Sequence, residues 1–148
     1  MALKKLVAGN WKMHGLASDL GEVRAIADES KRYRQVDVAL CVPAILIDRA
    51  VREVPGFAIG AQDVHHAEKG AHTGNISAAQ LLDAGASLTI VGHSERRGAH
   101  RESDSDVKAK AEAAKPQQPE LGGLDTPQTA PSRGDGADEL LDIPAFLR

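Results

Sequence analysis

The chain has 148 residues, a formal net charge of −3 and charges of both signs, which fits one domain with a hydrophobic core and a soluble surface. Aromatic residues make up only 3% of the sequence, and no basic stripe is present, so we expect no nucleic-acid partner. Asn10 and Lys12 interrupt the N-terminal apolar run before a signal-peptide core forms, and no later run reaches membrane-spanning length. A lone cysteine, Cys41, excludes an intrachain disulfide. We therefore expect a cytoplasmic protein with no membrane partner.

Short apolar runs alternate with amphipathic stretches over the first three quarters of the chain. Runs rich in Val, Ile, Leu and Ala predict strands that are buried on both faces, at 5–10, 36–42, 57–62 and 87–93. Helical periodicity between and after these runs predicts helices at 18–31, 44–53, 77–84 and 103–114. The alternation predicts an α/β fold of consecutive right-handed βαβ units on a parallel sheet.

Several side chains predict where these helices begin and which face they bury. Ser18 is expected to cap the first helix, and Ile45 to lie on the apolar side of the second. Ser77 and Gln80 have the spacing of a capping box, and Gly85 is placed to end the helix that they begin.

The last part of the chain, residues 115–148, breaks the pattern. It holds five of the seven prolines and several glycines, which block any long regular element. We therefore divide the chain into a domain at 1–114 and a Pro/Gly-rich tail at 115–148 that is predicted to be irregular or disordered.

Polar side chains follow the first and fourth predicted strands. Asn10 and Lys12 come at the end of the first strand, and His93 follows the fourth. Parallel α/β domains carry their chemistry at the carboxyl ends of their strands. The sequence therefore predicts that Lys12 and His93 project into the same mouth.

Four ordered blocks carry a resemblance to a known family. "AGNWKM" (8–13), "GAQDV" (60–64), "GAHTGNIS" (70–77) and "IVGHSERR" (90–97) resemble the signature blocks of the triosephosphate isomerases in order and spacing. The resemblance spans about residues 3–114 and implies a parallel (β/α)4 half of a TIM barrel. It implies the glycolytic and gluconeogenic interconversion of glyceraldehyde 3-phosphate and dihydroxyacetone phosphate through an enediolate, with no metal or organic cofactor.

The resemblance also implies roles for individual residues. Lys12 would neutralise the substrate phosphate and the developing oxyanion, and Asn10 would hydrogen-bond a substrate oxygen. His93, at the start of a helix, would stay neutral and act as the electrophile, while Glu95 would pair with Lys12. Without the resemblance, these residues also fit plainer interpretations: a solvated lysine, a turn asparagine, a structural histidine and a charged first helical turn.

The long loop at 63–75 implies a partner. In the family this loop docks on a second subunit, with Thr73 and Gly74 at its tip, and Arg96 matches an ion-pair residue near the contact. A homodimer, or another form of self-association, is therefore expected.

The same loop contains His65, His66 and His72, which would be metal ligands in a rival interpretation. Adjacent histidines are expected to point apart, and no second cluster of cysteines or carboxylates stands at ligand spacing. We therefore expect no metal site.

Some parts of the family pattern have no match in this sequence. The resemblance places the family's general base, a glutamate, after the sixth strand, followed by a tryptophan-containing lid and two glycine-rich phosphate loops. We expect the chain to be inactive alone, because proton transfer from carbon needs a positioned base. The alternative is a truncated, non-catalytic half-barrel that self-associates through its strand edges. Our hypothesis for the tail is a frameshift or rearrangement.

Overall fold

The computed structural model describes residues 3–116 and 145–147. Its elements, in chain order, are β1 (Lys5–Asn10), η1 (Ala17–Asp19), α1 (Leu20–Ser30), β2 (Val36–Cys41), η2 (Ala44–Leu46), α2 (Ile47–Glu53), β3 (Ala58–Ala61), α3 (Ala78–Asp83), β4 (Leu88–Val91), α4 (Ser94–Ala99), α5 (Asp104–Ala113) and β5 (Ala145–Leu147). The predicted α/β half-barrel is confirmed. Most of the predicted tail, 115–148, lies outside the described residues. None of the described helices is long and apolar enough to cross a membrane.

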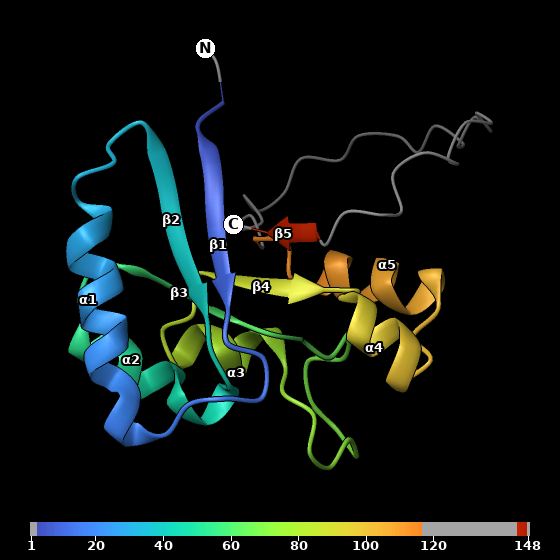
Figure 1. The fold of residues 1–148 in the computed structure, drawn as a ribbon. Helices are drawn as coiled ribbons and strands as arrows, with labels where there is room; N and C mark the ends of the chain where they lie inside the picture. The colour runs from blue at the N-terminus through green and yellow to red at the C-terminus, as the bar shows by residue number, and fades with distance from the viewer. Residues whose placement is uncertain (1–2, 117–144, 148) are drawn as a thin grey trace, which may run out of the picture.

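The sheet has the strand order β1-β2-β3-β4-β5 (Figure 1). The first four strands are parallel neighbours, as predicted, with Val7 opposite Val38 in the first pair. The fifth strand differs from expectation, because residues 145–147 pair antiparallel with β4 and place Phe146 opposite Ile90. The sequence analysis predicted no strand there, since three residues after a proline show no periodicity.

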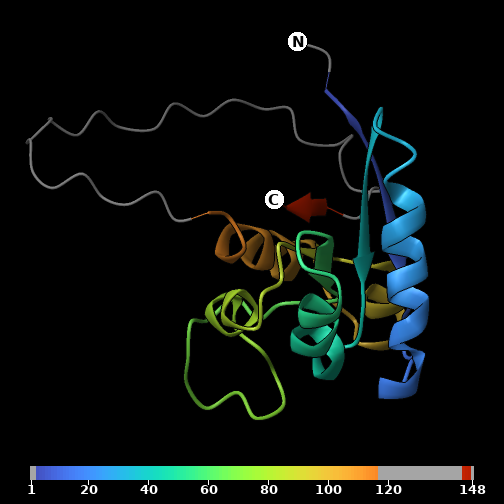
Figure 2. The same cartoon turned by 90° about the vertical axis from the view of Figure 1, so that its left-hand side faces the viewer.

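The helices α1 and α2 lie side by side against the outer face of the sheet (Figures 1 and 2). Leu40 and Val42 face this layer and belong to the main hydrophobic core, whereas Ala39 and Cys41 belong to a second cluster. Successive side chains of a strand point to opposite faces, so β2 is buried on both, as its sequence predicted. Burial raises the pKa of the Cys41 thiol to about 11.

The helix boundaries test the predicted caps. The Ser77 hydroxyl accepts the Gln80 N–H at 3.3 Å and the Gln80 side chain accepts the Ser77 N–H at 3.0 Å, which confirms the capping box. The Ser18 prediction is wrong, because the chain enters the helix through a 3-10 turn at η1, and the Asp19 carboxylate accepts the Leu16 N–H at 2.7 Å instead.

The prediction for Ile45 is also wrong. Its side chain is 81% exposed, although Leu46 beside it is buried. The helix begins with the 3-10 turn η2, in which the tighter winding of three residues per turn rotates Ile45 away from the core face.

A glycine on β3 gives a test of the packing between strands. A Cβ atom at Gly60 would lie 2.8 Å from both Cys41 Sγ and Leu88 Cγ. We expect Gly60→Ala to lower the free energy of unfolding by about 1–3 kcal/mol through overpacking. As a control, Gly21→Ala in α1 meets nothing within 4 Å and should raise stability by roughly 0.5–1 kcal/mol. Urea unfolding measures both, and a Gly60→Ala protein as stable as the parent would contradict the packing argument.

Candidate active site

The turn after β1 holds Lys12 in an unusual backbone conformation. Its φ of 53° lies in the left-handed region, which costs a non-glycine residue about 1–3 kcal/mol. Asn10, the last residue of β1, offsets part of this cost, because its Oδ1 accepts the Lys12 N–H at 2.8 Å. The last residue of the strand therefore helps to fix the backbone from which the Lys12 side chain projects.

Gln62 joins this turn from the end of β3. Its Nε2 donates to the Lys12 carbonyl at 2.7 Å and to Asn10 Oδ1 at 3.2 Å. The sequence analysis quoted the block around Gln62 but gave the residue no role. The signal was available, because Gln62 is a polar residue at the carboxyl end of a strand, like Asn10 and His93.

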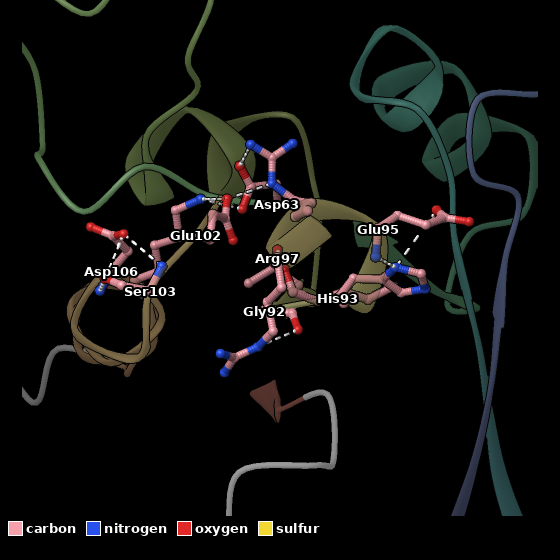
Figure 3. A network of polar contacts seen from close by, with 12 residues as sticks. Asp63, Gly92, His93, Glu95, Arg97, Glu102, Ser103 and Asp106 are labelled. Atoms are coloured by element: carbon pink, nitrogen blue, oxygen red, sulfur yellow. Dashed lines mark hydrogen bonds and ion pairs between the residues drawn. The ribbon is translucent and has the colours of Figure 1, made fainter. Parts of the chain in front are cut away.

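His93 is the cap of α4, as its place at the end of β4 predicted. Its Nδ1 accepts the N–H of Glu95 at 3.1 Å, so the proton of the neutral ring lies on Nε2. Figure 3 shows the Glu95 carboxylate lying next to the imidazole, where its Oε2 is 3.6 Å from Nδ1. One short turn therefore orients both side chains.

The ammonium of Lys12 reaches the same carboxylate from the turn after β1, at the opposite end of the row of parallel strands. Lys12 Nζ donates to Glu95 Oε1 at 2.6 Å, across 83 residues of sequence. This hydrogen bond holds the pKa of Glu95 below its usual value, assisted by the positive charge of Lys12. The structure thus brings Lys12 and His93, which the sequence analysis placed at one mouth, to Glu95, which the resemblance paired with Lys12.

A second polar cluster joins α4 to α5 and is formed by Asp63, Arg96, Glu102 and Lys110. Figure 3 shows its two carboxylate residues, Asp63 and Glu102. Arg96 contacts Glu102 at 2.6 Å and Asp63 at 3.1 Å, and Lys110 contacts the same two carboxylates. Burial would raise the pKa of Glu102, but hydrogen bonds from Lys110 and Arg96 outweigh it and hold that pKa below its usual value. The cluster ties α4 to α5 and to the end of β3, and the sequence analysis identified only Arg96 among its members.

The loop after β3 carries the remaining predicted residues. Thr73 and Gly74 are exposed at its tip. The rings of His65 and His66 stack with centroids 4.3 Å apart, and those of His65 and His72 are 4.1 Å apart, so the expectation that adjacent histidines point apart is wrong. Among the described residues, no group of three or more histidines, cysteines or carboxylates could hold a metal ion.

Two cavities lie away from this site. One of about 510 Å³ lies near the amino ends of the strands, where Leu6, Asp37 and Ala58 contribute to its lining. The other, of about 770 Å³, lies between α3 and the end of α5. Neither is lined by Lys12 or His93, so these two side chains meet at an open edge of the sheet rather than in either cavity.

The parallel strands, the helices on their outer face and the polar groups at their carboxyl ends define a β/α-barrel type of protein with half of the usual strands. The family model described as triosephosphate isomerase matches residues 5–120, and the chain belongs to this family.

Individual relatives agree with this assignment. Two curated proteins named triosephosphate isomerase, from a Ruegeria and a Chelativorans species, are 51% and 52% identical to the chain over 75% and 76% of its length. The crystal structure of triosephosphate isomerase from Bartonella henselae superposes with a TM-score of 0.71 and 46% identity over 76% of the chain. The chain spans slightly less than half of these proteins, namely 45%, 46% and 47%.

Removing the charge of Glu102 tests the cluster that this residue forms with Asp63, Arg96 and Lys110. Its side chain is only 7% exposed, so Glu102→Gln should lower the free energy of unfolding by about 3 kcal/mol, because two cations lose a buried partner. The lowered pKa of Glu102 means that its contribution is present above the unfolded value of 4.5 and is lost as the pH falls through the folded value. Denaturant unfolding from pH 7 to pH 3 should therefore show that the free energy of unfolding falls more steeply in the parent than in the variant.

An exposed pair supplies the control for this experiment. Glu29 pairs with Arg32 on the surface of α1, so Glu29→Gln should cost less than about 1 kcal/mol. Equal losses in the two variants would show that the cluster contributes no more than a surface ion pair.

Proposed function

We propose that this chain carries the carbonyl-polarising half of a triosephosphate isomerase active site. The observation that supports it best is the meeting of Lys12, Glu95 and His93 at the carboxyl ends of β1 and β4, in a chain that belongs to this family. The substrate is a small phosphorylated triose, interconverted between aldose and ketose through an enediolate. A role in glycolysis and gluconeogenesis, and with it a cytoplasmic location, forms part of the proposal.

We propose a task for each side chain, which its geometry supports. The Nε2–H of His93 donates a hydrogen bond to the substrate carbonyl as negative charge develops on its oxygen. The Lys12 ammonium, held by Glu95 in the free site, neutralises that oxygen and the substrate phosphate. The Asn10 side chain, whose Oδ1 is engaged with Lys12, uses its Nδ2 to donate to a substrate oxygen.

One task has no residue in the matched segment. Enolisation transfers a proton from carbon to a base, and the family's glutamate base follows the sixth strand, beyond the part of the family that residues 5–120 match. The chain alone would therefore bind and polarise a triose phosphate without turning it over, until a segment that supplies the base completes the site.

An isomerase assay tests whether this chain polarises the substrate while a separate segment supplies the base. We expect no turnover by the purified chain, and measurable turnover after addition of the C-terminal half of the Ruegeria isomerase. In that mixture, His93→Gln should lower the rate about 10²–10⁴-fold and Lys12→Met should abolish it. Turnover by the chain alone that Lys12→Met abolishes would show that the chain supplies its own base. A complemented rate that both substitutions leave unchanged would contradict the assigned roles.

Exposed apolar side chains beside the site support self-association. Met13 is 94% exposed and Ile45 is 81% exposed, and Leu16 is exposed as well. A Cβ atom on Gly15 would lie 3.3 Å from Leu46 Cδ1, so the loop that carries Met13 lies against the turn that carries Ile45. We propose this surface, together with Thr73, Gly74 and Arg96, as the contact between two copies.

The second candidate function, a non-catalytic module, would use a different surface. Among the described residues, β4 is covered by β5 whereas β1 has a neighbour on one side only, and Val7 on β1 is 55% exposed. An uncovered strand edge is a template for pairing with another chain.

Sedimentation velocity separates the two surfaces. We expect Ile45→Glu to shift the chain toward monomer by at least tenfold in dimer dissociation constant, because it buries a charge in the contact. Leu82→Glu on α3, which is also strongly exposed but lines the cavity between α3 and the end of α5, from whose lining Met13 and Ile45 are absent, serves as the control and should leave association unchanged. Association that persists in Ile45→Glu but disappears in Val7→Lys would favour the strand edge.

A further inference from the structure

The backbone of Lys12 is held from two directions, and only one of them is local. Asn10 belongs to the same turn and accepts the Lys12 N–H. Gln62 comes from 50 residues further along the chain and binds the Lys12 carbonyl at 2.7 Å. The peptide groups on both sides of the Lys12 Cα are therefore fixed, which specifies its left-handed φ of 53°.

The amide nitrogen of Gln62 has the number of donors that this task requires. Its two hydrogens meet two oxygens, the Lys12 carbonyl and Asn10 Oδ1. Asn10 Oδ1 in turn accepts the Lys12 N–H, so a closed set of hydrogen bonds runs from Gln62 through Asn10 to Lys12 and back. Neither a glutamate nor a methionine at this position could donate either bond.

We propose that Gln62 is a positioning residue, whose amide holds Lys12 in the left-handed conformation that directs its ammonium at Glu95 and at the substrate. The statement about the substrate rests on the proposed function, whereas the statement about Glu95 rests on the geometry alone. Gln62 contacts no reacting atom in this scheme and acts only through Lys12.

The consequence can be measured without turnover. The hydrogen bond from Lys12 holds the pKa of Glu95 below its usual value, and a displaced ammonium releases that pKa. We expect Gln62→Met, which is similar in size but has no donor, to raise the pKa of Glu95 toward that of Lys12→Met, the variant with no ammonium. Gln62→Glu places an acceptor against two oxygens and should raise it at least as far. Carbon-13 NMR titration of the assigned Glu95 carboxyl gives the values.

Two controls separate positioning from general loosening. Gln80→Met removes a hydrogen bond of the capping box on α3 and should leave the titration of Glu95 unchanged. In a Lys12→Met background, Gln62→Met should cause no further rise, because its effect passes through Lys12.

The proposal is overturned if Glu95 titrates as in the parent when either Gln62 variant is measured, or if Gln80→Met raises its pKa equally. Gln62→Glu keeps the shape of the side chain and provides the measurement if Gln62→Met does not fold. Because its negative charge raises the pKa of Glu95 by repulsion as well, only the part of the rise that disappears in the Lys12→Met background counts as positioning. If the mixture with the C-terminal half of the Ruegeria isomerase stays inactive while Glu95 titrates as expected, that result would count against the proposed function and leave the role of Gln62 intact.

Discussion

The contact between Lys12 and Glu95 joins the two ends of the parallel part of the sheet. Its partners come from the turn after β1 and from the first turn of α4, and no hydrogen bond between neighbouring strands would bring these segments together, because β2 and β3 lie between them. The ion pair is half exposed, so it adds little to stability. Its importance is geometric, because the pair meets only when the sheet curls enough to bring the carboxyl ends of β1 and β4 to one point.

Two different kinds of interaction support that point. On the β1 side, Asn10 accepts a hydrogen bond from the Lys12 N–H and Gln62 donates one to the Lys12 carbonyl, and these neutral amide bonds fix a strained backbone. On the β4 side, the buried cluster around Glu102 fixes the helix that carries Glu95. Amide bonds suit the first task because they have direction without charge, and would compete little with Glu95 for the Lys12 ammonium. In the charged cluster, the two cations contact the two carboxylates, so their electric fields largely cancel within the cluster.

The sequence allowed prediction of the fold and of the main site residues because both depend on local patterns. Apolar runs identified the four parallel strands, and the rule that chemistry gathers at their carboxyl ends identified Asn10, Lys12 and His93. What the patterns missed depends on tertiary geometry. The 3-10 turns changed the surroundings of Ser18 and Ile45, and the role of Gln62 needs the register between β1 and β3. The stacking of the loop histidines depends on a loop path that no periodicity encodes.

Under the proposed function, an open half-barrel would separate two requirements of enolisation that a closed site meets together. Orientation of the proposed electrophile would need only the residues described here, since His93 and Lys12 are held by hydrogen bonds within the chain. Exclusion of water needs walls, and neither cavity of the described residues includes these side chains. At a solvated edge, the proposed attraction between the Lys12 ammonium and an enediolate oxygen would be weakened by the high dielectric constant of water. A segment that completes the site would therefore contribute a low-dielectric enclosure as well as a base, and would strengthen the electrostatic effect of residues that this chain already positions.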